Sequence, residues 1–194
     1  MQLPTVTQDI FEYLSKGNFI SEDTANDEIR DLHRVIESNE NFELLREYFS
    51  KIGFQLEKGA GFYYFSRQEK KQDLERKIEQ AYKWLDILDF LKYYGSSVNS
   101  IFSQGTYFSP TKIFEQCNLN ENLAEKLKKL KSQYNELNKE KPLDQINKII
   151  ELLKDETFVE IHNPYTDEYK VLASFGYLEK LFGMINISDK SLNE

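Results

Sequence analysis

The stretch FELLREYFSKIGFQLEKGAGFYYFSRQEKK, from Phe42 to Lys71, decides the fold, because its hydrophobic period changes at Gly53. Before this glycine, apolar residues recur every three or four positions, which is typical of an amphipathic helix. After it they alternate as in a β-strand, and Gly-Ala-Gly at 59–61 predicts a tight reversal into a second strand. The sequence therefore predicts a helix joined directly to a two-stranded ribbon.

The residues before this stretch complete a small unit. Helical spacing predicts a short first helix that ends at Gly17 and an acidic second helix around 27–36. Between them, Asn18–Ser21 is a brief apolar segment that we expect to pair with a later strand. Helices followed by a ribbon make the winged-helix plan, so residues 1–70 are predicted to form an N-terminal winged-helix domain.

The same order of elements recurs with other lengths over residues 71–194. A long helix is expected to end at Gly95, Ser109 and Pro142 mark the starts of two more helices, and 157–172 reads as two strands around a turn. A last helix is expected at 173–185. The long helix carries an apolar face made of Leu74, Ile78, Ala81, Leu85, Leu88 and Leu91.

This second part is predicted to be a C-terminal winged-helix domain with a charged helical insertion near 119–141. The predicted fold class is thus α+β, mainly α, in a tandem winged-helix arrangement. The repeat is one of architecture and not of sequence.

Charge is segregated along the chain. The formal net charge of −8 argues against general coating of nucleic acid, which requires concentrated cationic surface. Residues 1–60 hold twelve acidic side chains against six basic ones, whereas residues 126–154 hold eight lysines against four acids. We interpret the acidic segment SEDTANDEIRD at 21–31 as a solvated helix face, with an acidic docking surface for a basic partner as the alternative.

Residues suited to catalysis or metal binding are few. Cys117 is the only cysteine, and neither His33 nor His162 has a second histidine at ligand spacing. We therefore predict no catalytic site, no metal site and no cofactor. The single cysteine and the absence of a long apolar run fit a cytoplasmic protein.

An unbroken aromatic row at 62–65 is the first candidate interaction surface. Side chains of a strand project alternately to both faces, so both faces of this ribbon need a cover, from this chain or from a partner. The predicted partner-binding residues are Phe19, Phe62, Tyr63, Tyr64, Phe65 and Tyr177.

The lysine-rich region is the candidate surface for DNA. The helix that begins at Pro142 is the one expected to approach a groove, where Gln145 and Asn147 are able to hydrogen-bond, but Asp144 and Glu151 would repel phosphate. An ordinary solvated helix is the alternative. The predicted DNA-binding residues are Lys128, Lys129, Lys139, Lys141, Lys148 and Lys154.

Four stretches carry a family resemblance over Tyr13 to Met184: YLSKGNFIS, LREYFSKIGFQLEKGAGFYYFSR, IIELLKDETFVEI and YKVLASFGYLEKLFG. Together they resemble the MukE family and its MksE relatives, the small accessory "kite" subunits of bacterial condensins. The resemblance implies a non-catalytic, nucleoid-associated homodimer that binds a kleisin of the MukF or MksF type, which bridges the heads of an SMC-like ATPase. It also implies a role in chromosome organisation and segregation or in plasmid restriction.

A stand-alone winged-helix transcription regulator is the alternative function. Such a protein requires a basic recognition helix, and the acidic balance of the chain counts against it.

Overall fold

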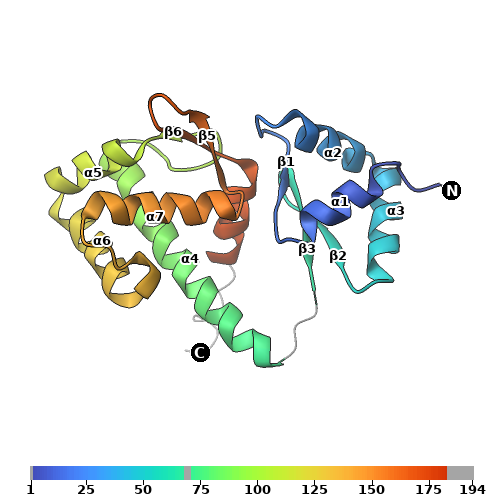
Figure 1. Ribbon diagram of the computed structural model, residues 1–194, viewed down its shortest axis with the longest axis horizontal. Helices are drawn as coiled ribbons and strands as arrows, with labels where there is room; N and C mark the ends of the chain where they lie inside the picture. Colours follow the sequence, from blue (N-terminus) through green and yellow to red (C-terminus); the bar gives the residue numbers. More distant parts are fainter. Residues whose placement is uncertain (1, 68–70, 183–194) are drawn as a thin grey trace, which may run out of the picture.

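Two small antiparallel sheets, one in each half of the chain, organise the protein in the computed structural model (Figure 1). The structure describes residues 2–67 and 71–182, and the side chains of 71–77 lie outside this description. Each sheet has three strands and packs against helices, so the fold is α+β and mainly helical, as predicted. We call residues 2–67 the first unit and residues 71–182 the second unit.

The first unit confirms the predicted change from helix to ribbon. In its sheet the last strand, β3, lies between the other two, with Ile20 opposite Tyr63 and Leu56 opposite Phe65. The predicted pairing of the segment at 18–21 is therefore confirmed. The elements of this unit are α1 (Thr7–Leu14), β1 (Ile20–Ser21), α2 (Asp27–Glu37), α3 (Asn39–Ser50), β2 (Gln55–Lys58) and β3 (Phe62–Ser66).

Glycines make two turns possible, the one from α3 into the ribbon and the one within the ribbon. Gly53, after α3, has φ +85°, and Gly61, before β3, has φ +77°, values that side chains with a Cβ rarely adopt. Both turns were predicted from the sequence.

The second unit repeats the order of strands, with its last strand again in the middle of the sheet. A final helical segment covers 176–182, and the end of the predicted last helix, 183–185, lies outside the described residues. The elements are α4 (Lys71–Ser97), β4 (Tyr107–Phe108), α5 (Pro110–Leu119), α6 (Glu121–Gln133), η1 (Asn135–Leu137), α7 (Pro142–Asp155), β5 (Val159–Asn163), β6 (Glu168–Val171) and η2 (Ala173–Phe175).

The charged region near 119–141 is a packed part of the second unit. Helix α6 buries Leu123, Leu127 and Leu130 in the core of this unit. Ion pairs also tie this region to α4, between Lys126 and Asp89 and between Lys83 and Glu136. The region is therefore a helix followed by a short 3-10 turn.

The prediction that the long helix ends at Gly95 is wrong, because α4 continues to Ser97. The chain folds back against α4 at this point. A Cβ on Gly95 would lie only 2.9 Å from the backbone nitrogen of Phe102 and 3.0 Å from the carbonyl oxygen of Ser100. The glycine thus permits close approach of two backbone segments and does not end the helix.

The predicted apolar face of α4 enters the core only along its second half. Leu88 and Leu91 are buried, whereas Ile78 is 46% exposed. Figure 1 shows the reason, since the first turns of α4 extend past the rest of the second unit. Leu74, also predicted on this face, lies among the side chains outside the description.

The two units share a core. One cluster of buried residues lies wholly within the first unit, but the other, centred on the second unit, also includes Phe19 and Phe62 from the first. The ring of Phe19 lies 5.2 Å from that of Phe158 and 5.2 Å from that of Tyr177, measured between centroids. Aromatic packing therefore joins the units.

Hydrogen bonds reinforce the same junction. The carboxylate of Glu160, on β5, accepts from the Thr24 hydroxyl at 2.7 Å and from the Ala25 amide at 2.9 Å. Asp23 accepts from the Ala173 amide at 3.0 Å, and its backbone carbonyl accepts from the Lys170 ammonium. The loop between β1 and α2 is thereby held against β5 and β6.

Replacing Phe19 with alanine should destabilise the whole protein, because Phe19 is 6% exposed and its ring packs on both units. We expect the free energy of unfolding to fall by about 3–5 kcal/mol. Urea denaturation of the full chain measures it. Tyr165→Ala is the control, since Tyr165 is 97% exposed; equal losses in the two variants would contradict the structural role of Phe19.

Replacing Gly95 with alanine should also lower stability. Helix propensity alone would favour alanine by about 1 kcal/mol, but the added Cβ meets backbone atoms that cannot move independently. The neighbouring variant Ser96→Ala, at an exposed position of the same turn, should change the free energy of unfolding by less than about 0.5 kcal/mol. A gain of stability in G95A by thermal denaturation would show that the backbones are not in close contact.

Candidate interaction surfaces

The aromatic row on β3 is covered on both faces by this chain. Phe62 and Tyr64 face the second unit and pack in its core cluster together with Phe19, whose ring lies 5.7 Å and 5.5 Å from theirs. Tyr63 and Phe65 face the core of the first unit, and the ring of Phe65 lies 4.9 Å from that of Phe49. Residues of this chain therefore cover both faces of β3.

The six predicted partner-binding residues divide by exposure. Phe19, Phe62 and Tyr63 are 6%, 4% and 1% exposed, so they lie inside the protein. The other three, Tyr64, Phe65 and Tyr177, are half-buried. The rings of Tyr64 and Tyr177 lie 5.1 Å apart. Partner binding at these positions stays a prediction, and only the half-buried residues are open to solvent.

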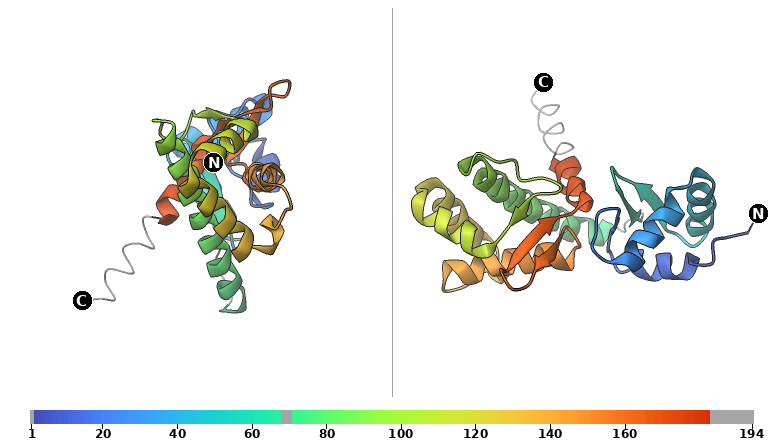
Figure 2. Two further views of the ribbon diagram at one scale, coloured as in Figure 1. Left: turned by 90° about the vertical axis from the view of Figure 1, so that its left-hand side faces the viewer. Right: turned by 90° about the horizontal axis from the view of Figure 1, so that it is seen from above.

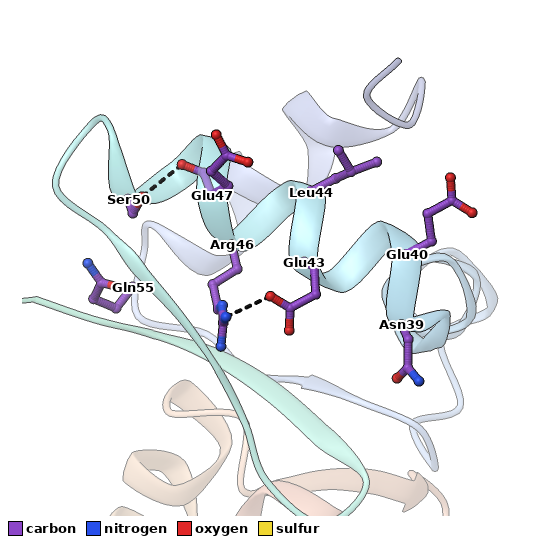
Figure 3. Close-up of a pocket in the computed structure, with 8 residues that line it drawn as sticks. All are labelled: Asn39, Glu40, Glu43, Leu44, Arg46, Glu47, Ser50 and Gln55. Carbon is purple, nitrogen blue, oxygen red and sulfur yellow. Dashed lines mark hydrogen bonds and ion pairs between the residues drawn. The ribbon is translucent and has the colours of Figure 1, made fainter. Parts of the chain in front are cut away.

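Helix α3 carries an acidic outer face. Figure 3 shows Glu40, Glu43 and Glu47 along it, with Arg46 between them. Ion pairs within the helix join Glu43 to Arg46 at 2.6 Å and Glu47 to Lys51 at 2.8 Å. The hydrogen bond from Lys51 lowers the pKa of Glu47, so that carboxylate stays ionised at neutral pH. This face would repel phosphate.

Helix α7 is also not basic on its outer face. Its inward face is apolar, and the outward positions combine two lysines with three acids. A hydrogen bond of 2.7 Å joins Lys148 to Glu151; it raises the pKa of the lysine and lowers that of the glutamate. The outward charged residues are Asp144, Lys148, Glu151, Lys154 and Asp155.

The prediction of a DNA-contacting side chain at Gln145 is wrong. Gln145 is buried, and its amide nitrogen donates a hydrogen bond of 2.6 Å to the carbonyl of Leu127 on α6. Its polar group therefore joins two helices. Asn147, the other residue named for such contact, is exposed.

The six predicted DNA-binding lysines do not form one compact patch on a single element. Lys128 and Lys129 lie on α6, Lys139 and Lys141 in the segment before α7, and Lys148 and Lys154 on α7. All are exposed except Lys148, which is half-buried beside Glu151. DNA binding by these residues stays a prediction.

The histidines and the cysteine lie in dissimilar surroundings. His33 is buried, its ring is 5.0 Å from that of Tyr63, and burial lowers its pKa. His162 is exposed beside Tyr107, with ring centroids 4.6 Å apart. Burial raises the pKa of Cys117 to about 11, so its thiol stays protonated at neutral pH. These residues lie on separate elements.

A groove between α1 and α2 is the surface that sequence reasoning missed. It has a volume of about 520 Å³, an apolar floor and acidic rims. The signal available in the sequence was a pair of acids three residues apart on each helix, Asp9 with Glu12 and Glu28 with Asp31. Nothing in the sequence indicated that the two helices lie side by side.

Comparison with known proteins gives one family. The family model described as "Condensin complex protein MksE" matches residues 5–182, which is most of the chain. A search of curated proteins finds no match. Within the described part of the chain, no helix combines the length and apolar character needed to cross a membrane.

The family match agrees with the resemblance to MukE and MksE that the sequence suggested, and confirms it. The chain therefore belongs to the MksE family of condensin complex proteins.

Proposed function

We propose that the chain is a non-catalytic subunit of an SMC–kleisin complex of the condensin type, in which it forms a homodimer and binds the kleisin. Through the kleisin it would associate with the SMC-like ATPase on the nucleoid, in the cytoplasm. The role of the complex would be chromosome organisation and segregation or plasmid restriction. Membership of the MksE family supports this function.

The tandem winged-helix fold belongs to the same proposal. Each unit runs from helix through strand, helices and then two strands, and in both sheets the last strand lies in the middle. In the second unit α6 is an additional helix. We place the domains at 1–70 and 71–194, so the boundary lies just before α4, and the last residues of the first domain, 68–70, lie outside the described residues.

One observation favours an adaptor over a reader of DNA sequence. Helices α3 and α7 each precede a ribbon, as recognition helices of winged-helix proteins do, yet neither has a basic outer face. Sequence-specific binding relies on cationic and amide side chains directed at base edges. This observation counts against the stand-alone transcription regulator.

The partner surface that we propose combines the aromatic residues of β3 with Tyr177 of the final helical segment, and we call it the aromatic edge. Its half-buried members Tyr64, Phe65 and Tyr177 would contact the kleisin. Phe19 packs against Tyr64 and Tyr177 from inside, Phe62 packs against Tyr64, and Tyr63 is buried in the first unit. Tyrosine suits such a surface because it offers a large apolar ring with a polar tip.

Purification of the tagged chain from its native cells should recover a kleisin and a long coiled-coil ATPase, identified by mass spectrometry. The double variant Tyr64→Ala/Tyr177→Ala should recover less kleisin, and Tyr165→Ala, on the other ribbon, should recover as much as the wild type. Circular dichroism must show that the double variant is folded. Recovery of the chain alone, from cells that express such a complex, would contradict the proposed function.

Direct contact with DNA is proposed to be weak and independent of sequence. Replacing five exposed lysines with glutamine should weaken binding, because contacts between lysine and phosphate supply the affinity. Each lost contact should also reduce the slope of log K against log salt concentration by about 0.9. Lys148→Gln should have little effect, since Glu151 already pairs with that lysine. Unchanged binding in fluorescence anisotropy would reject the assignment. The five residues are Lys128, Lys129, Lys139, Lys141 and Lys154.

A further inference from the structure

The groove between α1 and α2 combines an apolar floor with charged rims. The floor contains Ile29 and Leu32, which are buried, and Val6, Tyr13 and Val35, which are half-buried. An apolar floor between two helices is the kind of surface on which amphipathic segments dock. Water cannot hydrogen-bond to such a floor, so covering it with apolar side chains is favourable.

The rims of the groove carry an excess of negative charge. Asp9 and Glu12 project from α1, Glu28 and Asp31 from α2, and Lys16 is the one basic residue among those that line the groove. In each pair the acids are three residues apart, so they are neighbours on one side of their helix. Two acidic rows thus lie along the two helices that form the groove.

Most of these carboxylates have no cation beside them. Asp31 pairs with Arg34 at 2.7 Å, but for Asp9, Glu12 and Glu28 there is no ion pair within the described residues. Glu12 accepts a hydrogen bond from the amide of Gln8, which leaves its charge uncompensated. Counting the described residues alone, the groove therefore offers three carboxylates without an ion pair to a ligand.

The acidic face of α3 differs from the groove both in the pairing of its acids and in its apolar lining. Its carboxylates Glu43 and Glu47 are paired with Arg46 and Lys51, and Leu44 is the one large apolar residue that lines it. The similar number of acids on this face makes it a matched comparison for the groove, with little apolar floor and little free charge.

We propose that the groove between α1 and α2 docks a basic amphipathic segment of a partner protein. Apolar side chains of the segment would cover the floor, and lysine or arginine side chains on its flanks would pair with Asp9, Glu12 and Glu28. The unpaired carboxylates select this charge. They also exclude nucleic acid, whose phosphates would be repelled.

A second copy of the chain fits the groove less well than a separate protein. The exposed lysines of α6 are the candidate basic element, but α6 belongs to the other unit. The apolar face of α6, made of Leu123, Leu127 and Leu130, is already buried in the core of its own unit, so α6 offers no free apolar side to cover the floor of the groove. The docking site is distinct from the aromatic edge, so its test does not depend on the proposed function.

The test uses the full chain and a fluorescein-labelled peptide of leucines and lysines, with the leucines at helical spacing on one face. Fluorescence anisotropy should show binding to the wild type. The counterpart with glutamate in place of lysine should not bind. Asp9→Asn/Glu12→Gln/Glu28→Gln should weaken binding by roughly tenfold, because each exposed ion pair changes the affinity by about two- to threefold and the variant removes three of them.

The matched control removes the same formal charge elsewhere. Glu40→Gln/Glu43→Gln/Glu47→Gln on α3 should change the affinity by less than about twofold, because two of these acids are already paired. Equal losses in the two triple variants would overturn the proposal, since binding would then report only the net charge of the protein.

The floor is tested without a change of charge. Val35→Ser should weaken binding several-fold, after thermal denaturation has shown that the variant is folded. Full affinity in this variant would overturn the apolar part of the proposal. Sedimentation of the chain alone distinguishes the other occupant: if the groove variants change its oligomeric state, the groove holds a second copy and the proposal is wrong.

Discussion

The packing of Phe19 against rings from both units is the interaction on which the arrangement of the protein depends. Phe62 and Tyr64 approach it from the ribbon, and Phe158 and Tyr177 from the second unit. A ribbon with four consecutive aromatic residues cannot leave one face in water without exposing a large apolar surface. The second unit lies beside the first (Figure 2) and covers one face of the ribbon, so that Phe62 and Phe19 are buried in a shared core.

Because the aromatic row is largely buried, most of the surface available to partners is made by the exposed charged residues of the two units. The first unit places most of its large apolar residues in its own core and at the junction, and the exposed charges of its helices are mainly acidic. On α3 the charges are largely balanced by neighbouring cations, whereas along the groove between α1 and α2 they are not. The second unit holds the exposed lysines that are predicted to bind DNA. The balance of charge thus differs between the two units.

Where sequence reasoning went wrong, a tertiary contact overrode a local preference. Gly95 is typical of a helix end, but its lack of a Cβ lets the backbone of Phe102 pack closely against it. Gln145 looks like a solvent-facing polar residue of a groove-binding helix, but its amide is needed to satisfy the carbonyl of Leu127. The periodic face of α4 is correct in register, yet Ile78 lies beyond the part of the unit that covers it. To predict each of these three environments, one would have to know which residue distant in the sequence lies beside it.

By itself, the sequence determined most of the helices and strands and their order, the strand reversal at Gly61, and the family, because the hydrophobic period and the positions of glycines are local properties. It did not indicate the short strand β4. It also required that both faces of the row at 62–65 be covered. Only the tertiary structure decided what covers them, which acids are paired, and that α1 and α2 form a groove. Burial and ion pairing depend on which segments contact each other in three dimensions, and one sequence by itself does not specify those contacts.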